Sequence, residues 1–246
     1  MGMIQAYKNY FLILIISFVY SEGSWWPDKC NYSDTIITGS DTSITRYICK
    51  ENGRKEILKE KNGKYHGKYT AWSSNGEKIE EFSYYNDEID GEVKGWDTTG
   101  YLISHAFYMK GKPVGLHKEF YSKDSPEALI NYNDSGQKHG LCESWREDGT
   151  RKDSIVYHNG SIKEIRAYYQ NGKPRYWVKN ININNGKKME AVYYDTTGKI
   201  CGEIREGNGT YILWSDDAKE RWIETYKNGE EVASRKLKPD ENPDWK

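Results

Sequence analysis

The sequence predicts an all-β fold, an antiparallel meander of stacked β-hairpins of about 24 residues each that together form an elongated open sheet. Three observations predict it. Glycines recur at steps of 24, 24 and 25 residues (91−67, 115−91 and 140−115). A tyrosine stands seventeen residues after each of these glycines. Turn signals such as Asn75-Gly76 separate runs that are rich in β-favouring residues. A fixed period of this size is typical of repeat architectures.

Equivalent positions of the four clearest repeats carry similar side chains. The anchor glycines are Gly67, Gly91, Gly115 and Gly140, the aromatic residues five positions later are Trp72, Trp96, Phe120 and Trp145, and the tyrosines are Tyr84, Tyr108, Tyr132 and Tyr157. Neighbouring hairpins in register place equivalent side chains in rows, so we interpret all twelve as structural repeat positions. The anchor glycines are expected to allow a backbone or an aromatic ring to approach closely, because glycine otherwise weakens a strand.

Composition and charge fit this interpretation and exclude some functions. Apolar residues make up 36% of the 246 residues and aromatic residues 14%, with 21 tyrosines and 9 tryptophans. Amphipathic rings can cover a thin sheet while they keep a polar edge in water. The net charge is −1, from 36 basic and 37 acidic residues, so no basic excess is present to bind phosphate backbones. We therefore expect no nucleic-acid partner.

The N-terminal segment, residues 1–21, has the layout of a secretory signal peptide with a signal-like helix. Lys8 is the only charged residue before Glu22, and residues 10–20 form an apolar run. Cleavage is expected after Ser21. The run is shorter than the roughly 20 residues that span a bilayer, and an uncleaved anchor or a buried strand are the alternatives. The expected location is secreted, periplasmic or cell-envelope, with membrane attachment only through an uncleaved N-terminus.

Residues 22–61 form a predicted N-terminal extension that contains the first two of four cysteines. Export permits disulfides, and four cysteines allow three connectivities. A Cys30–Cys49 bridge, the pairing favoured here, would close a short loop and stabilise the fold by about 3 kcal/mol. Cys142 occupies a packing position of its repeat and is interpreted as a buried free thiol. No Cys-x-x-Cys pair suggests zinc.

The repeats are predicted over residues 62–172, and a degenerate continuation is predicted over residues 173–233. Trp96-Asp97-Thr98-Thr99-Gly100 reappears in the continuation as Tyr194-Asp195-Thr196-Thr197-Gly198, which indicates a further hairpin. Residues 234–246 contain Pro239 and Pro243 among charged residues and are predicted to be a flexible tail.

No catalytic or cofactor-binding constellation is recognisable. His66 and His139 share one repeat position with Asp90 and Val114, which indicates a structural role for that position. Metalloprotease, serine-hydrolase and phosphate-loop motifs are absent from the sequence. Carboxylates are plentiful, but no pair is singled out as a glycosidase would require. Asn31, Asn133, Asn159 and Asn208 begin Asn-x-Ser/Thr triplets that a turn-rich sequence produces by chance. We predict a protein that is not an enzyme and binds no cofactor or metal.

Two segments carry a family resemblance. Residues 65–69 (YHGKY) with Trp72 and Asn75-Gly76, and residues 138–140 (KHG) with Trp145 and Asp148-Gly149, resemble MORN repeats. The spacing is similar to the variant form found in bacterial proteins often labelled antitoxin components. The resemblance covers about residues 62–172, and it implies an open hairpin meander and an antitoxin-like function.

The leading functional hypothesis is an exported, non-enzymatic repeat protein that acts as a protein-binding module or scaffold, because stacked units present extended surfaces. An antitoxin or immunity-like protein that neutralises a toxin is the alternative implied by the resemblance. An envelope carbohydrate-binding or carbohydrate-active protein is a further alternative. Lipid binding of the kind proposed for MORN repeats fits poorly with a net charge of −1.

Overall fold

A computed structural model describes residues 31–179, 189–215, 217 and 219–243. Contacts divide the chain into residues 1–30 and residues 31–246, and all of the described residues belong to the second unit. The predicted signal peptide with its helix, residues 1–21, and Cys30 lie outside the described residues.

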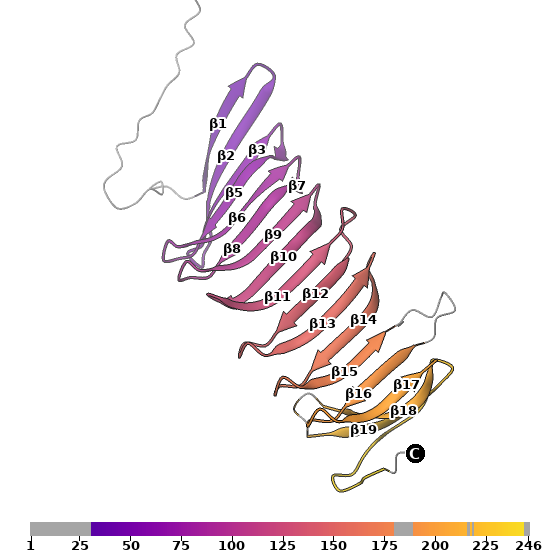
Figure 1. The fold of residues 1–246 in the computed structure, drawn as a ribbon. Coiled ribbons are helices and arrows are strands. Elements are labelled where there is room, and N and C mark those ends of the chain that lie inside the picture. Colours follow the sequence, from indigo (N-terminus) through magenta and orange to yellow (C-terminus); the bar gives the residue numbers. More distant parts are fainter. Residues whose placement is uncertain (1–30, 180–188, 216, 218, 244–246) are drawn as a thin grey trace, which may run out of the picture. The chain divides into compact units, whose positions relative to one another are not determined.

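The described residues form one antiparallel sheet of 20 strands with no helix, which confirms the all-β meander (Figure 1). The first ten strands are β1 (Tyr32–Thr38), β2 (Asp41–Cys49), β3 (Lys55–Lys61), β4 (Lys64–Tyr65), β5 (Gly67–Trp72), β6 (Lys78–Tyr85), β7 (Glu88–Ile89), β8 (Gly91–Trp96), β9 (Leu102–Met109) and β10 (Lys112–Ser122). The other ten are β11 (Ser125–Tyr132), β12 (Gly140–Trp145), β13 (Arg151–His158), β14 (Ser161–Tyr168), β15 (Pro174–Lys179), β16 (Glu190–Tyr194), β17 (Ile200–Arg205), β18 (Asn208–Trp214), β19 (Arg221–Lys227) and β20 (Glu230–Lys236). Within these residues no helix is long and apolar enough to cross a membrane.

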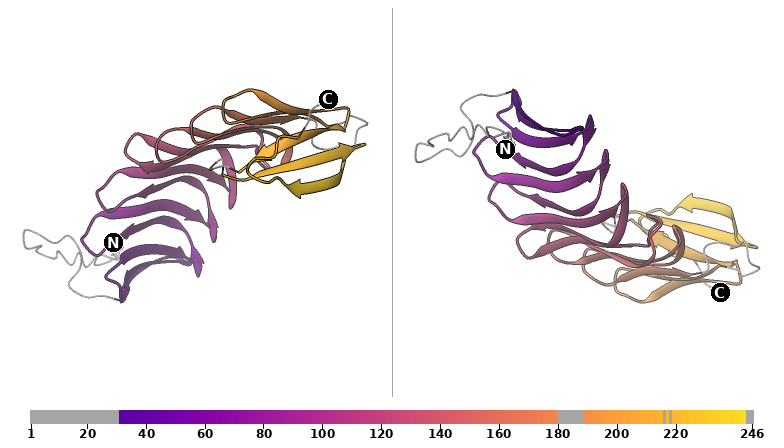
Figure 2. Two further views of the ribbon diagram at one scale, coloured as in Figure 1. Left: turned by 90° about the horizontal axis from the view of Figure 1, so that it is seen from below. Right: turned by 90° about the horizontal axis from the view of Figure 1, so that it is seen from above.

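The sheet extends beyond the predicted repeats in both directions. Strands β1 to β3 place residues 32–61 in the same sheet, with seven register pairs between β1 and β2. At the other end β20 pairs with β19 as far as Lys236. Figure 2 shows the same succession of hairpins from two further sides.

Tight turns join the hairpins along one edge of the sheet. They place Asn62, Asn86, Asn159 and Asn228 at φ values between 48° and 54°, a left-handed conformation that asparagine tolerates better than most residues. Several of these turns also bond to the chain at the turn before. The N–H of Gly111 donates to the carbonyl of Ile89 at 2.8 Å, and that of Gly160 donates to the carbonyl of Lys138 at 2.8 Å. Successive hairpins are therefore tied together at this edge.

Five-residue turns join most of the strands along the opposite edge, and their geometry repeats, whereas a two-residue turn joins β10 to β11. The N–H of Asp97 donates to the carbonyl of Tyr101 at 2.9 Å, and the N–H of Gly100 donates to the carbonyl of Asp97 at 3.1 Å. The same two bonds recur in the turns at residues 50–54, 73–77, 146–150, 169–173 and 195–199. The carboxylate of Asp97 accepts from the hydroxyl and the N–H of Thr99, and these bonds hold its pKa below the ordinary value. The repeated Asp-Thr-Thr-Gly sequence predicts this turn because every bond is local.

The C-terminal end of the sheet is more ordered than the sequence predicts. Residues 234–236 belong to β20, and Leu237 is buried. The guanidinium of Arg221 donates to the carbonyls of Lys238 and Pro239 at 2.9 and 2.5 Å. The predicted start of the tail at residue 234 is therefore too early. Residues 244–246 lie outside the described residues.

Candidate functional site

The repeat tyrosines lie on one face of the sheet, which we call the tyrosine face. Each is the direct cross-strand partner of the anchor glycine of its own repeat: Gly67 pairs with Tyr84, Gly91 with Tyr108, Gly115 with Tyr132 and Gly140 with Tyr157. Directly paired residues share a face, and alternate residues of a strand return to it. The constant offset of seventeen residues in the sequence is therefore the register of one hairpin.

The anchor glycines are required by backbone conformation, not by close approach. Their φ values are 100°, 98°, 68° and 82°, which favour glycine. A Cβ added at Gly91 or Gly115 would meet nothing within 4 Å, so the expectation of a close contact at these positions is wrong. A bulge explains the conformation. Between the pairs Glu60–Tyr65 and Ile57–Thr70, one strand advances three residues (60−57) while the other advances five (70−65).

The aromatic residues five positions after each anchor lie on the opposite face. Trp72 follows Ala71, which is fully buried among side chains of the tyrosine face, and successive residues alternate between faces. The register of pairing shifts just before Trp72, Trp96 and Trp145 alike, where the neighbouring strand carries one extra residue. These side chains are half-buried, and the ammonium of Lys78 lies 4.4 Å from the ring centre of Trp96.

The tyrosine face is occupied by its own packing. Tyr69 stacks on Phe82 with ring centres 4.6 Å apart, and the His117 ring lies 4.6 Å from that of Tyr132. Nε2 of the buried His117 bonds the carbonyl of Phe107 at 2.9 Å. Burial also raises the pKa of Tyr132 above its ordinary value, which keeps the phenol neutral. The repeat tyrosines therefore serve as core in a sheet that no second layer covers within the described residues.

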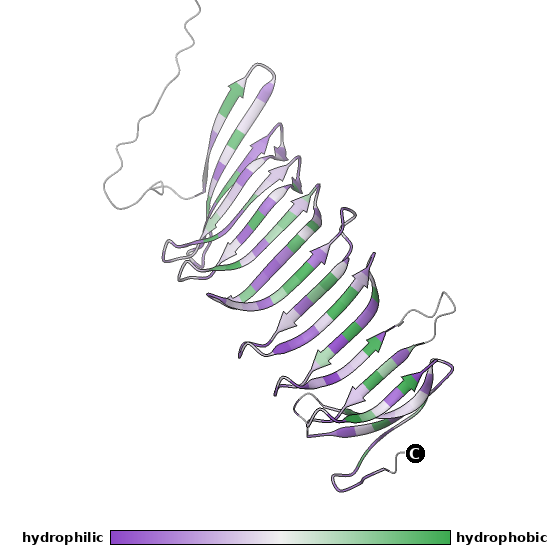
Figure 3. Cartoon of the chain, viewed as in Figure 1, coloured by the Kyte–Doolittle hydropathy of each residue, from purple (hydrophilic) through white to green (hydrophobic). Residues whose placement is uncertain are grey.

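The opposite face carries large apolar side chains in contact with solvent. Tyr85 on β6, Phe107 and Met109 on β9, and Leu141 on β12 are 57%, 41%, 46% and 45% exposed. Their neighbours Tyr84, Tyr108 and Cys142 belong to the tyrosine face, so alternation places all four on the other side. We call these four residues the apolar patch. Figure 3 shows apolar segments alternating with polar ones along these strands.

Charged side chains next to the patch are paired with one another. The carboxylate of Glu92 lies 2.7 Å from the ammonium of Lys94 and 2.7 Å from Nε2 of His105. The hydrogen bond from Lys94, followed by that from His105, lowers the pKa of Glu92. The His105 ring in turn lies 5.0 Å from the ring of Phe107. The surroundings of the patch are therefore polar but nearly balanced in charge.

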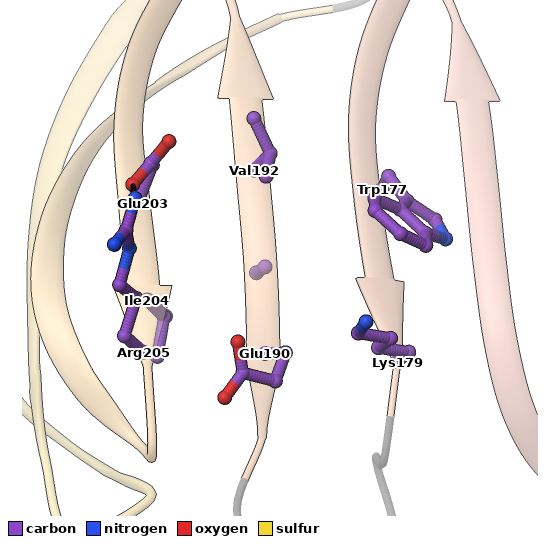
Figure 4. Close-up of a pocket in the computed structure, with 8 residues that line it drawn as sticks. Trp177, Lys179, Glu190, Val192, Glu203, Ile204 and Arg205 are labelled. Carbon is purple, nitrogen blue, oxygen red and sulfur yellow. Dashed lines mark hydrogen bonds and ion pairs between the residues drawn. The ribbon is translucent and has the colours of Figure 1, made fainter.

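A shallow depression of about 280 Å³ lies on the same face over β15, β16 and β17 (Figure 4). Its polar groups are partnered within the fold. The indole N–H of Trp177 donates to Glu164 at 2.8 Å, and the ammonium of Lys179 lies 4.7 Å from the indole ring. Glu203 pairs with Arg205 at 2.6 Å. These contacts give the depression a structural explanation.

The cysteines separate into bonded and free groups. Cys49 is disulfide-bonded, while its predicted partner Cys30 lies outside the described residues. Cys142 is a buried free thiol, as predicted. Cys201 is also free, and burial raises its pKa to about 12. A thiol with such a pKa is not a nucleophile at neutral pH.

Histidines and sequon asparagines support turns. Nδ1 of His139 lies 3.1 Å from Oδ1 of Asn159, and Nδ1 of His66 lies 3.4 Å from Oδ1 of Asn86. The amide of Asn133 donates to Asn159 at 3.0 Å. Among the described residues no three His, Cys, Asp or Glu side chains gather as a metal site would require.

Sequence reasoning did not identify the apolar patch. The available signal was the apolar run Ala106-Phe107-Tyr108-Met109, which places large side chains on both faces of one strand. This run shows an exposed apolar surface only once it is known which face of the sheet is buried by packing, and the structure supplies that information. In comparisons with known proteins, no protein-family model matches the chain and no curated protein matches it.

Proposed function

We propose that this chain is a non-enzymatic repeat protein that binds another protein through the apolar patch. The observation that carries the proposal is the difference in packing between the two faces. Tyrosines and small residues of the tyrosine face pack against one another. The apolar patch on the other face is exposed to solvent, through Tyr85, Phe107, Met109 and Leu141. These residues are spread over β6, β9 and β12, and exposed large apolar side chains on one face are typical of interaction sites.

The chemistry of the patch favours a protein partner. Aromatic residues and methionine are enriched at the centres of protein interfaces, and a polar rim surrounds such centres. The ion pairs Glu92–Lys94 and Lys68–Glu81 provide a polar rim for the apolar patch. Each pair combines one negative and one positive charge, so the rim has no large excess of either sign. Neither a nucleic acid nor an anionic membrane would gain from such a surface.

The resemblance to MORN repeats supports the same reading of a repeat scaffold. An antitoxin or immunity-like role is the more specific form of the proposal, in which the bound protein is a toxin. The signal-like segment at residues 1–21 supports an exported protein that meets its partner outside the cytoplasm.

Site-specific photo-crosslinking in the cells that produce the chain tests the proposal. A photoreactive phenylalanine analogue at Phe107 is expected to give a discrete protein adduct, which the added change Met109→Ser should weaken at least several-fold. The matched control carries the analogue at Ile200, which is 52% exposed and outside the patch. Identical adducts at both positions, or none at Phe107, would contradict the proposal. Thermal unfolding of each variant verifies that the fold is retained.

A further inference from the structure

The two terminal strands of the sheet differ in how their outer edges are protected. β20 carries Glu230, Glu231, Arg235 and Lys236, and charged side chains discourage edge pairing. The segment after β20 is also held in place, because Leu237 donates its N–H to the carbonyl of Arg221 at 2.8 Å. Glu241 pairs with Arg235 at 2.5 Å. The C-terminal edge is therefore protected by charged side chains, and the chain that follows β20 is held by its bonds to Arg221 and Arg235.

β1 has none of these protections within the described residues. It pairs with β2 alone, and its sequence, YSDTIIT, contains one charged residue and no proline. Ile36 and Ile37 are 66% and 71% exposed, more than any other large apolar residue that the structure describes. An exposed strand with free backbone groups and apolar side chains is a template for another strand.

The β1–β2 hairpin indicates which backbone groups are free. Thr38 pairs with Asp41 across the two-residue turn at Gly39-Ser40, and residues of an antiparallel strand alternate between bonding one neighbour and the other. The N–H and C=O groups of Ser33, Thr35 and Ile37 therefore point away from β2. Asn31, just before the strand, has φ 58° and accepts a hydrogen bond from the N–H of Cys49, which closes the β1–β2 end.

We propose that β1 pairs antiparallel with β1 of a second copy of this chain, about a two-fold axis at Ile36. This register sets Ile36 against Ile36 of the partner subunit and pairs Thr35 with Ile37 of the partner subunit. It also pairs Asp34 with Thr38 of the partner subunit, which keeps the two carboxylates apart. Both isoleucines are then covered, and the outward backbone groups meet each other.

We infer that the strand that pairs with β1 belongs to a second copy of the chain, because this pairing is self-complementary and forms a closed dimer. An antiparallel pair of identical strands has two-fold symmetry, so both open edges are used at once. The charged side chains of β20 disfavour pairing at the other end of the sheet, so the assembly should stop at a dimer instead of growing into a fibre. A contact this small is expected to be weak, with a Kd on the order of 10 µM.

Sedimentation velocity of the full chain over a concentration series is the first test. We expect a monomer–dimer equilibrium for the unaltered chain, and a monomer for Thr35→Pro. Proline at this position removes an outward N–H and leaves the bonds to β2 in place, so the unfolding temperature should not change. The matched control Val232→Lys alters an exposed apolar residue of the other terminal strand and should leave the equilibrium unchanged.

Opposed charges test the register. Ile36→Lys and Ile36→Glu should each be monomeric, because each places like charges against each other at the axis. An equimolar mixture of the two should restore a dimer of one copy of each. The proposal is overturned by a chain that stays monomeric up to about 100 µM, tenfold above the expected Kd. A Thr35→Pro dimer of unchanged stability, or a mixture that remains monomeric, overturns it equally.

Discussion

Glycine has different roles in the regular repeats of β5 to β13 and in the hairpins of β16 to β18. In the repeats, Gly91 has φ 98° and a Cβ there would meet nothing within 4 Å. At Gly202 a Cβ would lie 2.3 Å from the Cα of Tyr211, and at Gly209 it would lie 2.0 Å from the carbonyl oxygen of Glu203. The first glycine provides backbone freedom, whereas the other two provide space.

The space at Gly202 is used by two tyrosines. Tyr193 and Tyr211 are the cross-strand partners of Gly202 on its two sides, so the glycine lies between them on the tyrosine face. Their rings stack with centres 3.5 Å apart and planes 2° from parallel. A side chain on the strand between them would separate the rings. The missing side chain therefore produces the most closely stacked ring pair that the structure describes.

The denser packing of this C-terminal region changes its electrostatics. Tyr193 and Tyr211 belong to the larger buried cluster, together with Val178, Ala191 and Ile204. Burial is the main cause that raises the pKa of both phenols well above the ordinary value. The equivalent cluster in the repeats contains only Tyr69, Ala71 and Phe82 as buried members.

Alanine at the two kinds of glycine should give the largest difference between the regions. Gly202→Ala must push β17 and β18 apart, so we expect a loss of more than about 3 kcal/mol in the free energy of unfolding. Gly91→Ala strains one backbone position without a clash and should cost about 1 kcal/mol. Urea unfolding followed by tryptophan fluorescence measures both. Equal losses of unfolding free energy for the two variants would contradict the conclusion that Gly202 is needed for space and Gly91 for its backbone conformation.

Alkaline pH should also separate the regions. A phenol whose folded pKa is raised contributes stability that is fully present below its unfolded pKa, near 10, and is lost as the pH rises towards the folded value. We expect Tyr193 and Tyr211 to ionise only when their region opens. Tyrosinate absorbance should then appear in two steps, of which the second belongs to Tyr193 and Tyr211. The variant Tyr211→Phe should reduce the second step, and a single step in the unaltered chain would contradict the prediction.

The aspartates of the five-residue turns should contribute to stability in the same way in both regions, because the turn has the same hydrogen bonds in each. Burial opposes ionisation of Asp195, but its bonds from Thr197 and Lys199 outweigh that effect and lower the pKa. The stability from a lowered pKa is present above the unfolded value of about 3.8 and is lost as the pH falls below it. Asp195→Ala should lower the Tm by about 2 °C at pH 7 and by less at pH 3. Asp97→Ala should shift the Tm in the same direction, and a shift that grows at pH 3 would contradict this sign.

The smallest effect is expected on the opposite face of the repeats. Phe107→Ser should change the free energy of unfolding by less than about 0.5 kcal/mol, because the ring is already partly in water. Phe82→Ala on the tyrosine face, the matched aromatic truncation, should cost about 3 kcal/mol. Thermal unfolding of both variants provides the measurement. A large loss for Phe107→Ser would assign the apolar patch to packing and remove the basis of the proposed function.

The sequence by itself determined the all-β class, the hairpin period and the turns. Asn86 and Gly100 act through bonds to residues a few positions away or through their own φ, and such local preferences are visible in a short stretch of sequence. The constant spacing of Gly67 and Tyr84 was visible in the sequence, and the structure shows that it is the register of one hairpin. These features depend on neighbours in the chain, so periodicity was sufficient to predict them.

Only the tertiary structure decided which face is covered, why each glycine is needed and where the sheet ends. Phe82 and Phe107 are the same residue type in strands of similar composition, yet one is buried and the other exposed. Gly202 is demanded by Tyr193 and Tyr211, which lie nine residues to either side in the chain (202−193 and 211−202) and meet only across two strands. Burial and steric fit arise from residues that the fold brings together, and that information is absent from any local pattern.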